Sequence, residues 1–291
     1  MTPSFSLYLT HWNCNPYLQL QHMINKKVVT AKTRIILAFA SFNFTDASTI
    51  PDLGELTLQQ IQSITDLAHS VNAKISLSIG GINCPFMGST FYKRPSDLAQ
   101  IINNSFIRHG FDGVDFNIED NNVDKYFITN TAYLINTLRS LNKTLYITLT
   151  TVTPEYSSYH YNLLQLTISN LSAWQIVECN FIIDSSFYEP HPEITIDPET
   201  AYPTQIQYEI NYYITVWGVP KEKIILGIMI GEDDHANCLT LYNALYLASF
   251  SKLNQLQGIV LWDALTDANG CDGNAPYAYS MGVQRMFKSI S

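Results

Sequence analysis

Residues 110–119 read GFDGVDFNIE, a stretch in which acidic and amide residues alternate with apolar ones. Successive side chains of a β-strand point to opposite faces of a sheet, so Asp115, Asn117 and Glu119 share one face and apolar residues share the other. Burying two carboxyl groups and an amide is costly unless they are hydrogen-bonded or hydrated, whereas the apolar face suits a covering helix. The stretch therefore predicts a buried strand whose polar face carries chemistry.

Similar short runs of β-branched and apolar residues recur on both sides of this stretch. Most are followed by a longer segment with helical spacing, as at residues 58–71, where apolar residues return every three or four positions. Eight strand-then-helix units without a Pro-, Gly- or Ser-rich linker favour a closed (β/α)8 TIM barrel, an α/β fold, over an open doubly wound sheet. We expect one domain spanning residues 1–291. Its strands are predicted at residues 5–9, 34–40, 74–79, within 110–119, and at 145–150, 174–183, 223–230 and 258–262.

Composition agrees with a folded protein and excludes several classes of function. Hydrophobic residues make up 46% of the 291 residues and charged residues 14%, which is enough apolar material for one large core. The formal net charge is -9 and basic residues form no runs, so no nucleic-acid partner is expected. No apolar run approaches the roughly 20 residues that span a bilayer, so no membrane partner is expected either.

The cysteines and the first residues bear on metal binding and localisation. The five cysteines are odd in number and lack metal-binding spacing, so we expect reduced thiols, no metal site and no cofactor. The first residues lack the features of an export signal. The protein is therefore expected in the cytoplasm by default, or outside the cell if a leader was removed, and the sequence leaves its localisation unknown.

Polar and aromatic residues follow several of the predicted strands. In TIM barrels the chemistry lies at the C-terminal ends of the strands. Gly80 and Gly81, the segment 117–119, Tyr188 and Trp262 would all lie there. The sequence thus predicts a site at one mouth of the barrel.

Three motifs resemble those of a known family. Residues 112–119, DGVDFNIE, resemble the DGxDxDxE signature of glycoside hydrolase family 18, the chitinases and endo-β-N-acetylglucosaminidases. Residues 78–81, SIGG, resemble the SxGG motif of its third strand, and residues 258–262, GIVLW, are similar to its eighth strand. The three motifs occur in the family's order over nearly the whole chain. The closest resemblance is to compact hevamine-type chitinases and bacterial endoglycosidases, which implies a barrel without a large inserted subdomain.

The resemblance implies roles for the polar strand. Glu119 would be the general acid that protonates the glycosidic oxygen and then the base that activates water, with Asp115 as its charge partner. The nucleophile would be the substrate's own N-acetyl oxygen, because family 18 is an exception to two-carboxylate retention. The partner implied is an oligosaccharide or polysaccharide that contains N-acetylglucosamine, and we expect a monomer.

This chain departs from the family pattern at Asn117, where the signature has Asp. The amide oxygen can still accept the acetamido N–H, but it supplies no negative charge to the oxazolinium intermediate. Losing one such contact typically costs roughly 10²- to 10³-fold in rate. We expect a slow enzyme, and family 85 endoglycosidases, which also place an amide there, are active.

Further residues of the sugar site are expected by the same resemblance. Trp262 would be the floor on which a sugar ring stacks, and Tyr8 and Phe39 match aromatic positions that line the site. On strand six, ungapped counting places Ser185 at the tyrosine that binds the acetamido oxygen, whereas a two-residue bulge would place Tyr188 there. We choose Tyr188, with Asp184 as a polar wall. Gly80 and Gly81 either allow a tight turn or shape the substrate site.

Three hypotheses remain open at this point. The first is a retaining glycosidase that cleaves β-1,4 linkages beside N-acetylglucosamine, either in chitin oligomers or in an N-glycan core. The second is a lectin-like or storage protein that kept Glu119 and lost useful turnover through Asn117. The third, a barrel enzyme for a phosphorylated metabolite, is weak because no Gly-rich phosphate loop follows strand seven or eight.

Overall fold

The structure is a computed structural model that describes most of the barrel. The described residues are 3–40, 53–81, 94–117, 125–151, 177–183, 207, 210–211, 213–216, 218–230, 240–271 and 273–289.

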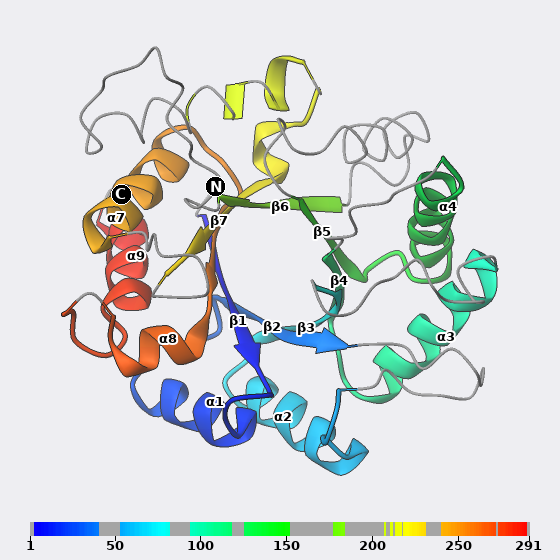
Figure 1. Cartoon of the computed structure of the whole chain (residues 1–291), viewed down its shortest axis with the longest axis horizontal. Coiled ribbons are helices and arrows are strands. Elements are labelled where there is room, and N and C mark those ends of the chain that lie inside the picture. Colours follow the sequence, from blue (N-terminus) through cyan, green and yellow to red (C-terminus); the bar gives the residue numbers. More distant parts are fainter. Residues whose placement is uncertain are drawn as a thin grey trace.

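Eight parallel strands close into a barrel in chain order, from β1 next to β2 round to β8 next to β1. Helices surround the ring of strands, with α1 and α2 beside β1 to β3, and α3 and α4 on the opposite side from α7 and α9 (Figure 1). This confirms the predicted (β/α)8 barrel, and every predicted strand overlaps an observed one. The strands are β1 (Ser4–Thr10), β2 (Thr33–Ala40), β3 (Lys74–Gly80), β4 (Gly113–Asn117), β5 (Tyr146–Thr151), β6 (Val177–Ile183), β7 (Ile224–Met229) and β8 (Gly258–Trp262).

The helices begin where the sequence offers caps. Asn15 accepts a hydrogen bond from the Leu18 N–H before α1, and Thr57 forms a capping box with Gln60 before α2. The helices are α1 (Pro16–Asn25), α2 (Leu58–Ser70), α3 (Pro95–Arg108), α4 (Lys125–Leu141), α7 (Leu241–Leu253), α8 (Ala264–Asn269) and α9 (Ala278–Lys288), with a 3₁₀ turn η6 (Lys221–Lys223). Within the described ranges, no helix is long and apolar enough to cross a bilayer.

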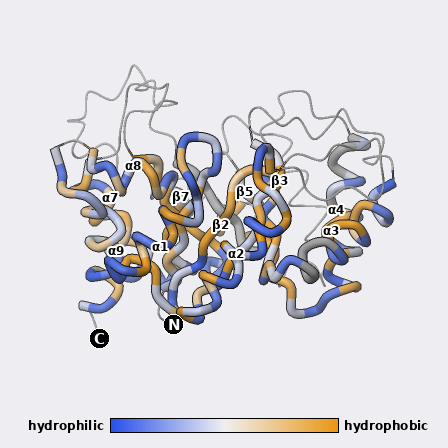
Figure 2. The backbone as a smooth tube through the Cα atoms, turned by 90° about the horizontal axis from the view of Figure 1, so that it is seen from below, coloured by the Kyte–Doolittle hydropathy of each residue, from blue (hydrophilic) through white to orange (hydrophobic). Residues whose placement is uncertain are grey.

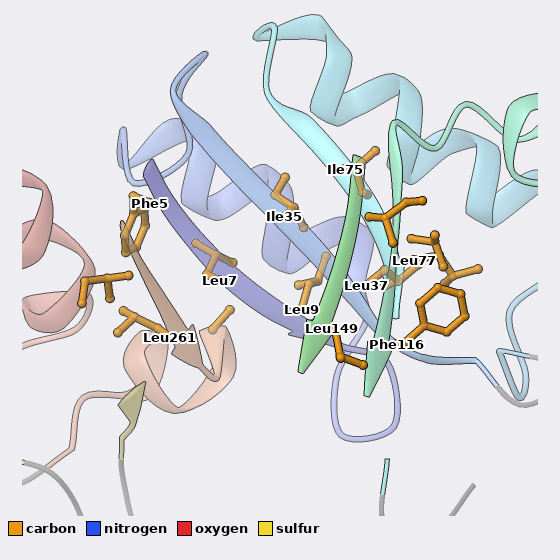
Figure 3. Close-up of a cluster of buried hydrophobic side chains, with 14 of the residues drawn as sticks. Phe5, Leu7, Leu9, Ile35, Leu37, Ile75, Leu77, Phe116, Leu149 and Leu261 are labelled. Carbon is orange, nitrogen blue, oxygen red and sulfur yellow. The ribbon is translucent and has the colours of Figure 1, made fainter. Parts of the chain in front are cut away.

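The main hydrophobic core lies between the strands and the helices. Apolar stretches concentrate along the central strands, while the helices carry both polar and apolar segments (Figure 2). Figure 3 shows side chains such as Leu7, Ile35 and Leu77 on neighbouring strands, and these belong to the same buried cluster as Leu20 of α1 and Ile64 of α2. A second cluster inside the barrel contains Tyr8, Ile36, Ala38, Ile225 and Val260. Odd and even positions of the strands therefore face different environments, as period-two alternation requires.

Asp112, the first acid of the DGVDFNIE motif, joins three elements at the N-terminal end of the barrel. Its carboxylate lies 2.7 Å from the Lys74 ammonium and 2.9 Å from His69 Nε2, and it accepts the Ile75 N–H at 3.0 Å. Burial acts to raise the pKa of Asp112, but the bonds from Lys74, Ile75 and His69 outweigh it and hold this pKa below its ordinary value of 3.8. The acid therefore stabilises the junction of α2, β3 and β4, away from the mouth.

Replacing Asp112 with Asn is expected to destabilise the fold by about 1 kcal/mol near neutral pH. The loss is modest because Lys74 is 58% and His69 39% exposed, so water screens both pairs. The depressed pKa stabilises the fold above the unfolded-state value of 3.8, so the deficit should shrink as the pH falls below it. Urea unfolding against pH measures this, with Asp66→Asn on exposed α2 surface as the control. A deficit that does not change with pH would contradict the ion-pair explanation.

Candidate active site

The polar face of β4 points into the barrel, as its alternation predicts. Val114 and Phe116 are buried in the outer core, whereas Asp115 and Asn117 face inward and are 0% and 2% exposed. Glu119, the predicted general acid, lies outside the described residues, and so do Asp184 and Tyr188. The described part of the predicted site consists of Asp115, Asn117, Gly80, Gly81, Tyr8, Phe39 and Trp262.

Hydroxyl groups surround the Asp115 carboxylate. One oxygen accepts hydrogen bonds from Ser78 Oγ at 2.6 Å and Tyr8 Oη at 3.0 Å. The other accepts from Thr148 Oγ1 at 2.5 Å and Thr150 Oγ1 at 3.0 Å. Four donors from β1, β3 and β5 therefore hold one buried acid on β4, and we call these four residues the hydroxyl cage.

Strand register accounts for this cage. Asp115 of β4 pairs with Ser78 of β3 on one side and with Thr148 of β5 on the other. Paired residues of parallel strands point to the same side of the sheet, so both hydroxyls are brought to the carboxylate by the backbone. Tyr8 reaches across from β1, where its hydroxyl also lies 2.9 Å from Thr150 Oγ1.

Complete burial raises the pKa of Asp115 above its ordinary value, and the hydrogen bonds of the cage oppose this rise. The charged form loses its hydration in the barrel, and the four hydroxyls replace only part of it. Asp115 therefore keeps its proton to a higher pH than an exposed aspartate does. A buried carboxyl group with a raised pKa is a candidate functional group.

Aromatic rings gather beside this acid. Phe39 at the end of β2 stacks on Trp262 at the end of β8, with centroids 5.2 Å apart and planes 15° apart. The rings of Tyr8 and Trp262 meet edge to face, with centroids 5.1 Å apart, and Tyr8 is fully buried. The structure thus brings together three of the four predicted aromatic residues, Tyr8, Phe39 and Trp262, and the Tyr8 hydroxyl is hydrogen-bonded to Asp115.

Trp12, which no pattern in the sequence predicts as a site residue, extends this group. The Trp12 ring stacks on the Phe39 ring, with centroids 5.9 Å apart and planes 19° apart, and its centroid lies 6.1 Å from that of Trp262. Trp12 is 48% exposed. The His11 ring makes a T-shaped contact with the Trp12 ring, with centroids 5.4 Å apart, and His11 Nε2 lies 3.4 Å from the Phe39 carbonyl oxygen. We call Trp12, Phe39 and Trp262 the aromatic platform.

Gly80 and Gly81 are required by close contacts at the end of β3. Both have positive φ angles, +112° and +84°. A Cβ on Gly80 would lie 1.9 Å from the Asn117 carbonyl oxygen, and one on Gly81 would lie 2.6 Å from the Phe39 ring. Asn117 O in turn accepts the Gly81 N–H at 2.9 Å. The two glycines therefore let the backbone of β4 and the ring of Phe39 each pack closely against the end of β3.

The hydroxyl cage was missed although the sequence carries a signal for it. Ser76 and Ser78 alternate along β3, and Thr148 and Thr150 alternate along β5, each on the inward face. Alternating hydroxyl residues on the strands before and after an acidic strand predict donors for its carboxylate once the strands are placed next to each other. No comparable pattern marks Trp12, which lies in a loop.

Comparisons with known proteins agree with the fold. The family model described as "Glycosyl hydrolases family 18" matches residues 5–240. No protein with a curated description matches the sequence. Among solved structures, the active domain 2 of a chitinase from Pyrococcus furiosus is 15% identical, with a TM-score of 0.76, covering 100% of this chain and 97% of that chain.

Two further solved structures are similar over nearly their whole length. A GH18 chitinase from Pseudoalteromonas aurantia is 18% identical, with a TM-score of 0.68, covering 97% of this chain and 99% of that chain. A GH18 chitinase from Cycas revoluta in complex with (GlcNAc)3 is 14% identical, with a TM-score of 0.66, covering 98% and 99%. At these identities the likeness shows the fold.

Replacing Thr148 with Val tests the cage, because it removes one donor and keeps the shape of the side chain. We expect a loss of about 1.5–3 kcal/mol in unfolding free energy when Asp115 is ionised, since hydrogen bonds to charged groups are strong. The pKa of folded Asp115 already lies above the unfolded value of 3.8, and the variant should raise it further. The loss of unfolding free energy should therefore grow as the pH rises above 3.8 and folded Asp115 becomes ionised.

Urea unfolding at several pH values measures this effect. The control is Thr65→Val, because the Thr65 hydroxyl is equally buried but donates to the neutral carbonyl of Gln62. Its deficit should not depend on pH. Equal pH dependence in the two variants would contradict the assignment of Thr148 as a donor to a carboxylate.

Proposed function

Since the chain belongs to glycosyl hydrolases family 18, we propose that it hydrolyses β-1,4 linkages of N-acetylglucosamine in chitin-type oligosaccharides with retention of configuration. The hevamine-like subtype, a single domain over residues 1–291 and action as a monomer are parts of the same proposal. An N-glycan core is the other substrate that this chemistry would fit.

One observation carries the proposal: a fully buried acid, Asp115, lies in a cage of hydroxyls beside an aromatic platform at the mouth of a closed barrel. A buried carboxylate is costly, and four donors from three other strands are devoted to it. A purely structural core would fill this space with apolar side chains at lower cost. The arrangement therefore supports a catalytic role for the polar face of β4.

In the proposed reaction, Glu119 is the general acid, two residues beyond Asn117 in the DGVDFNIE motif. Its proton goes to the glycosidic oxygen while the acetamido oxygen of the substrate attacks C1, so the C1–O bond breaks and a C1–O bond to the acetamido group forms. Water, deprotonated by Glu119, then attacks C1 from the side of the departed group. The acetamido group is released unchanged and the configuration is retained.

Asp115 and Asn117 support this intermediate in different ways. The Asn117 amide oxygen accepts the acetamido N–H and orients its carbonyl oxygen for attack. Asp115, buried one side-chain layer below, supplies negative charge toward the oxazolinium and toward Glu119. Burial raises the pKa of Asp115 and so opposes this role, whereas the four hydroxyl donors of the cage favour the charged form that the role needs.

The aromatic platform supports a substrate of more than one sugar. Pyranose rings present apolar C–H faces that stack on flat aromatic side chains. Trp262 and Phe39 are half-buried near the acid, whereas Trp12 is 48% exposed and lies further out on the β1–α1 loop. A related GH18 chitinase was solved in complex with (GlcNAc)3, a ligand of this kind. In this proposal Tyr188 and Asp184 complete the acetamido site from the segment after β6.

The direct test compares the wild type with Glu119→Gln on a fluorogenic chitobioside and on a high-mannose glycopeptide. Gln keeps the size of the side chain but has no proton to give, so hydrolysis should fall by about 10²- to 10⁴-fold. The control is Glu222→Gln in η6, at the other end of the barrel, which should retain full rate. Equal hydrolysis by Glu119→Gln and the wild type would refute the proposal, and the substrate that is cleaved identifies the glycan class.

Asn117→Asp tests what the amide does to the rate. An ionised Asp would face the positive oxazolinium, so we expect kcat to rise by about 10²-fold. A second buried carboxylate beside Asp115 will also broaden the acid side of the pH profile, because the two acids titrate as a pair. The control Asn13→Asp adds the same charge in the exposed β1–α1 loop. An unchanged or lower kcat would contradict the expected electrostatic cost of the amide.

A further inference from the structure

A hollow of about 270 Å3 lies between the first turns of α1 and α2. Its walls are apolar and come from Pro16 and Tyr17 of α1, Leu56 before α2, and Ile64 of α2. Pro16 and Ile64 are buried, while Tyr17 and Leu56 are half-buried, so the hollow opens to solvent with an aromatic ring at its edge. A concave apolar surface with few polar groups is the common form of a small-ligand site.

The polar rim presents amide donors in fixed positions. Asn15 Oδ1 accepts the Leu18 N–H at 3.2 Å, and Gln60 Oε1 accepts the Thr57 N–H at 2.8 Å and Thr57 Oγ1 at 2.9 Å. Each carbonyl oxygen is thus used as a helix cap, which turns the NH2 end of each amide away from the helix backbone. Within the described part of the chain, neither NH2 group has a hydrogen-bond partner. The rim therefore offers donors to a ligand with acceptor oxygens.

The hollow opens on the same end of the barrel as the aromatic platform. Asn15 comes three residues after Trp12 on the β1–α1 loop. The segment before α2 also lies close to this loop. Gly54, two residues before Leu56, lies so near the His11 ring that a Cβ added to Gly54 would be 3.2 Å from it. The loop that carries Trp12 therefore connects the platform with the hollow.

We propose that this hollow is a second sugar-binding site that takes one N-acetylhexosamine unit of a longer glycan. The lining contains no Asp, Glu, Lys, Arg or His, which suits a neutral ligand. The Tyr17 ring offers a stacking surface for a pyranose face, the amide NH2 groups meet the acetamido carbonyl oxygen, and the apolar wall receives the acetamido methyl group. This inference deepens the proposed function, because it uses the same class of glycan at a different place.

The sharpest test changes the donors without changing the caps. Gln60→Glu keeps an oxygen for the Thr57 N–H, and Glu is a standard residue at this position of a capping box, so α2 should remain stable. The NH2 donor is lost and an oxygen repels the acetamido oxygen. Gln59→Glu is the matched control, since it adds the same charge on the same turn but outside the lining.

The measurement is an NMR titration of the full chain carrying Glu119→Gln with (GlcNAc)3, read at the Tyr17 and Ser63 amides for the hollow and at the Trp262 indole for the mouth. We expect saturable shifts at Tyr17 and Ser63, weakened about threefold to tenfold by Gln60→Glu, as for the loss of one hydrogen bond. Gln59→Glu should leave them unchanged. Unfolding in urea confirms that both variants remain folded.

Three outcomes would overturn the proposal. One is that the Tyr17 and Ser63 signals stay unmoved while the Trp262 indole saturates. Another is that both Glu variants weaken binding equally, which would indicate a general charge effect. The third is an equal response to cellotriose, which lacks acetamido groups. Failure of the proposed function is a separate result. It would show as an unmoved Trp262 indole signal in the titration and as no hydrolysis by the wild type, whatever the Tyr17 amide signal does.

Discussion

The burial of the Asp115 carboxylate is the constraint on which the rest of the site depends. Its four hydroxyl donors come from β1, β3 and β5, so the acid is satisfied only when all these strands are in register with β4. A slip of one residue would turn the donors to the outer face and leave a charge in the barrel without partners. Closing the barrel and assembling the site are therefore one event, and the hydroxyls make the correct register the favoured one.

The strand β4 connects two kinds of acid over a short distance. Asp112 lies just before the strand and makes ion pairs at the N-terminal end of the barrel, while Asp115 and Asn117 lie inside it toward the mouth. The first is screened by water and stabilises the junction of three elements, and the second is buried and stabilised by neutral donors. One motif thus fixes the position of the strand at one end and presents chemistry at the other. This division explains why the motif begins with an acid that lies at the opposite end of β4 from Asn117.

Much of this arrangement could be predicted from the sequence, because the strands and the polar face of β4 follow from period-two alternation alone. The hydroxyl cage required the register between strands, which a single sequence does not contain, although the alternation of Ser76 with Ser78 and of Thr148 with Thr150 was a usable signal. Trp12 could not be predicted, because a loop residue has no periodicity and its contacts depend on how β1 and β2 end. The catalytic and binding roles of the site residues remain predictions, and three of these residues, Glu119, Asp184 and Tyr188, lie outside the described residues.

The amide at Asn117 and the cage around Asp115 have a common physical reason. Asn117 is 2% exposed, so an aspartate there would place two carboxylates in one dry space, where one of them would have to hold a proton. With four hydroxyls on Asp115, the chain carries a single buried charge and satisfies it without a second acid. The electrostatic cost to catalysis is limited by distance: opposite charges attract by about 4 kcal/mol at 4 Å and an effective dielectric of 20, and by about 2 kcal/mol at twice that separation. In the proposed reaction, a carboxylate one layer below the amide would therefore keep roughly half of the attraction for the positive intermediate.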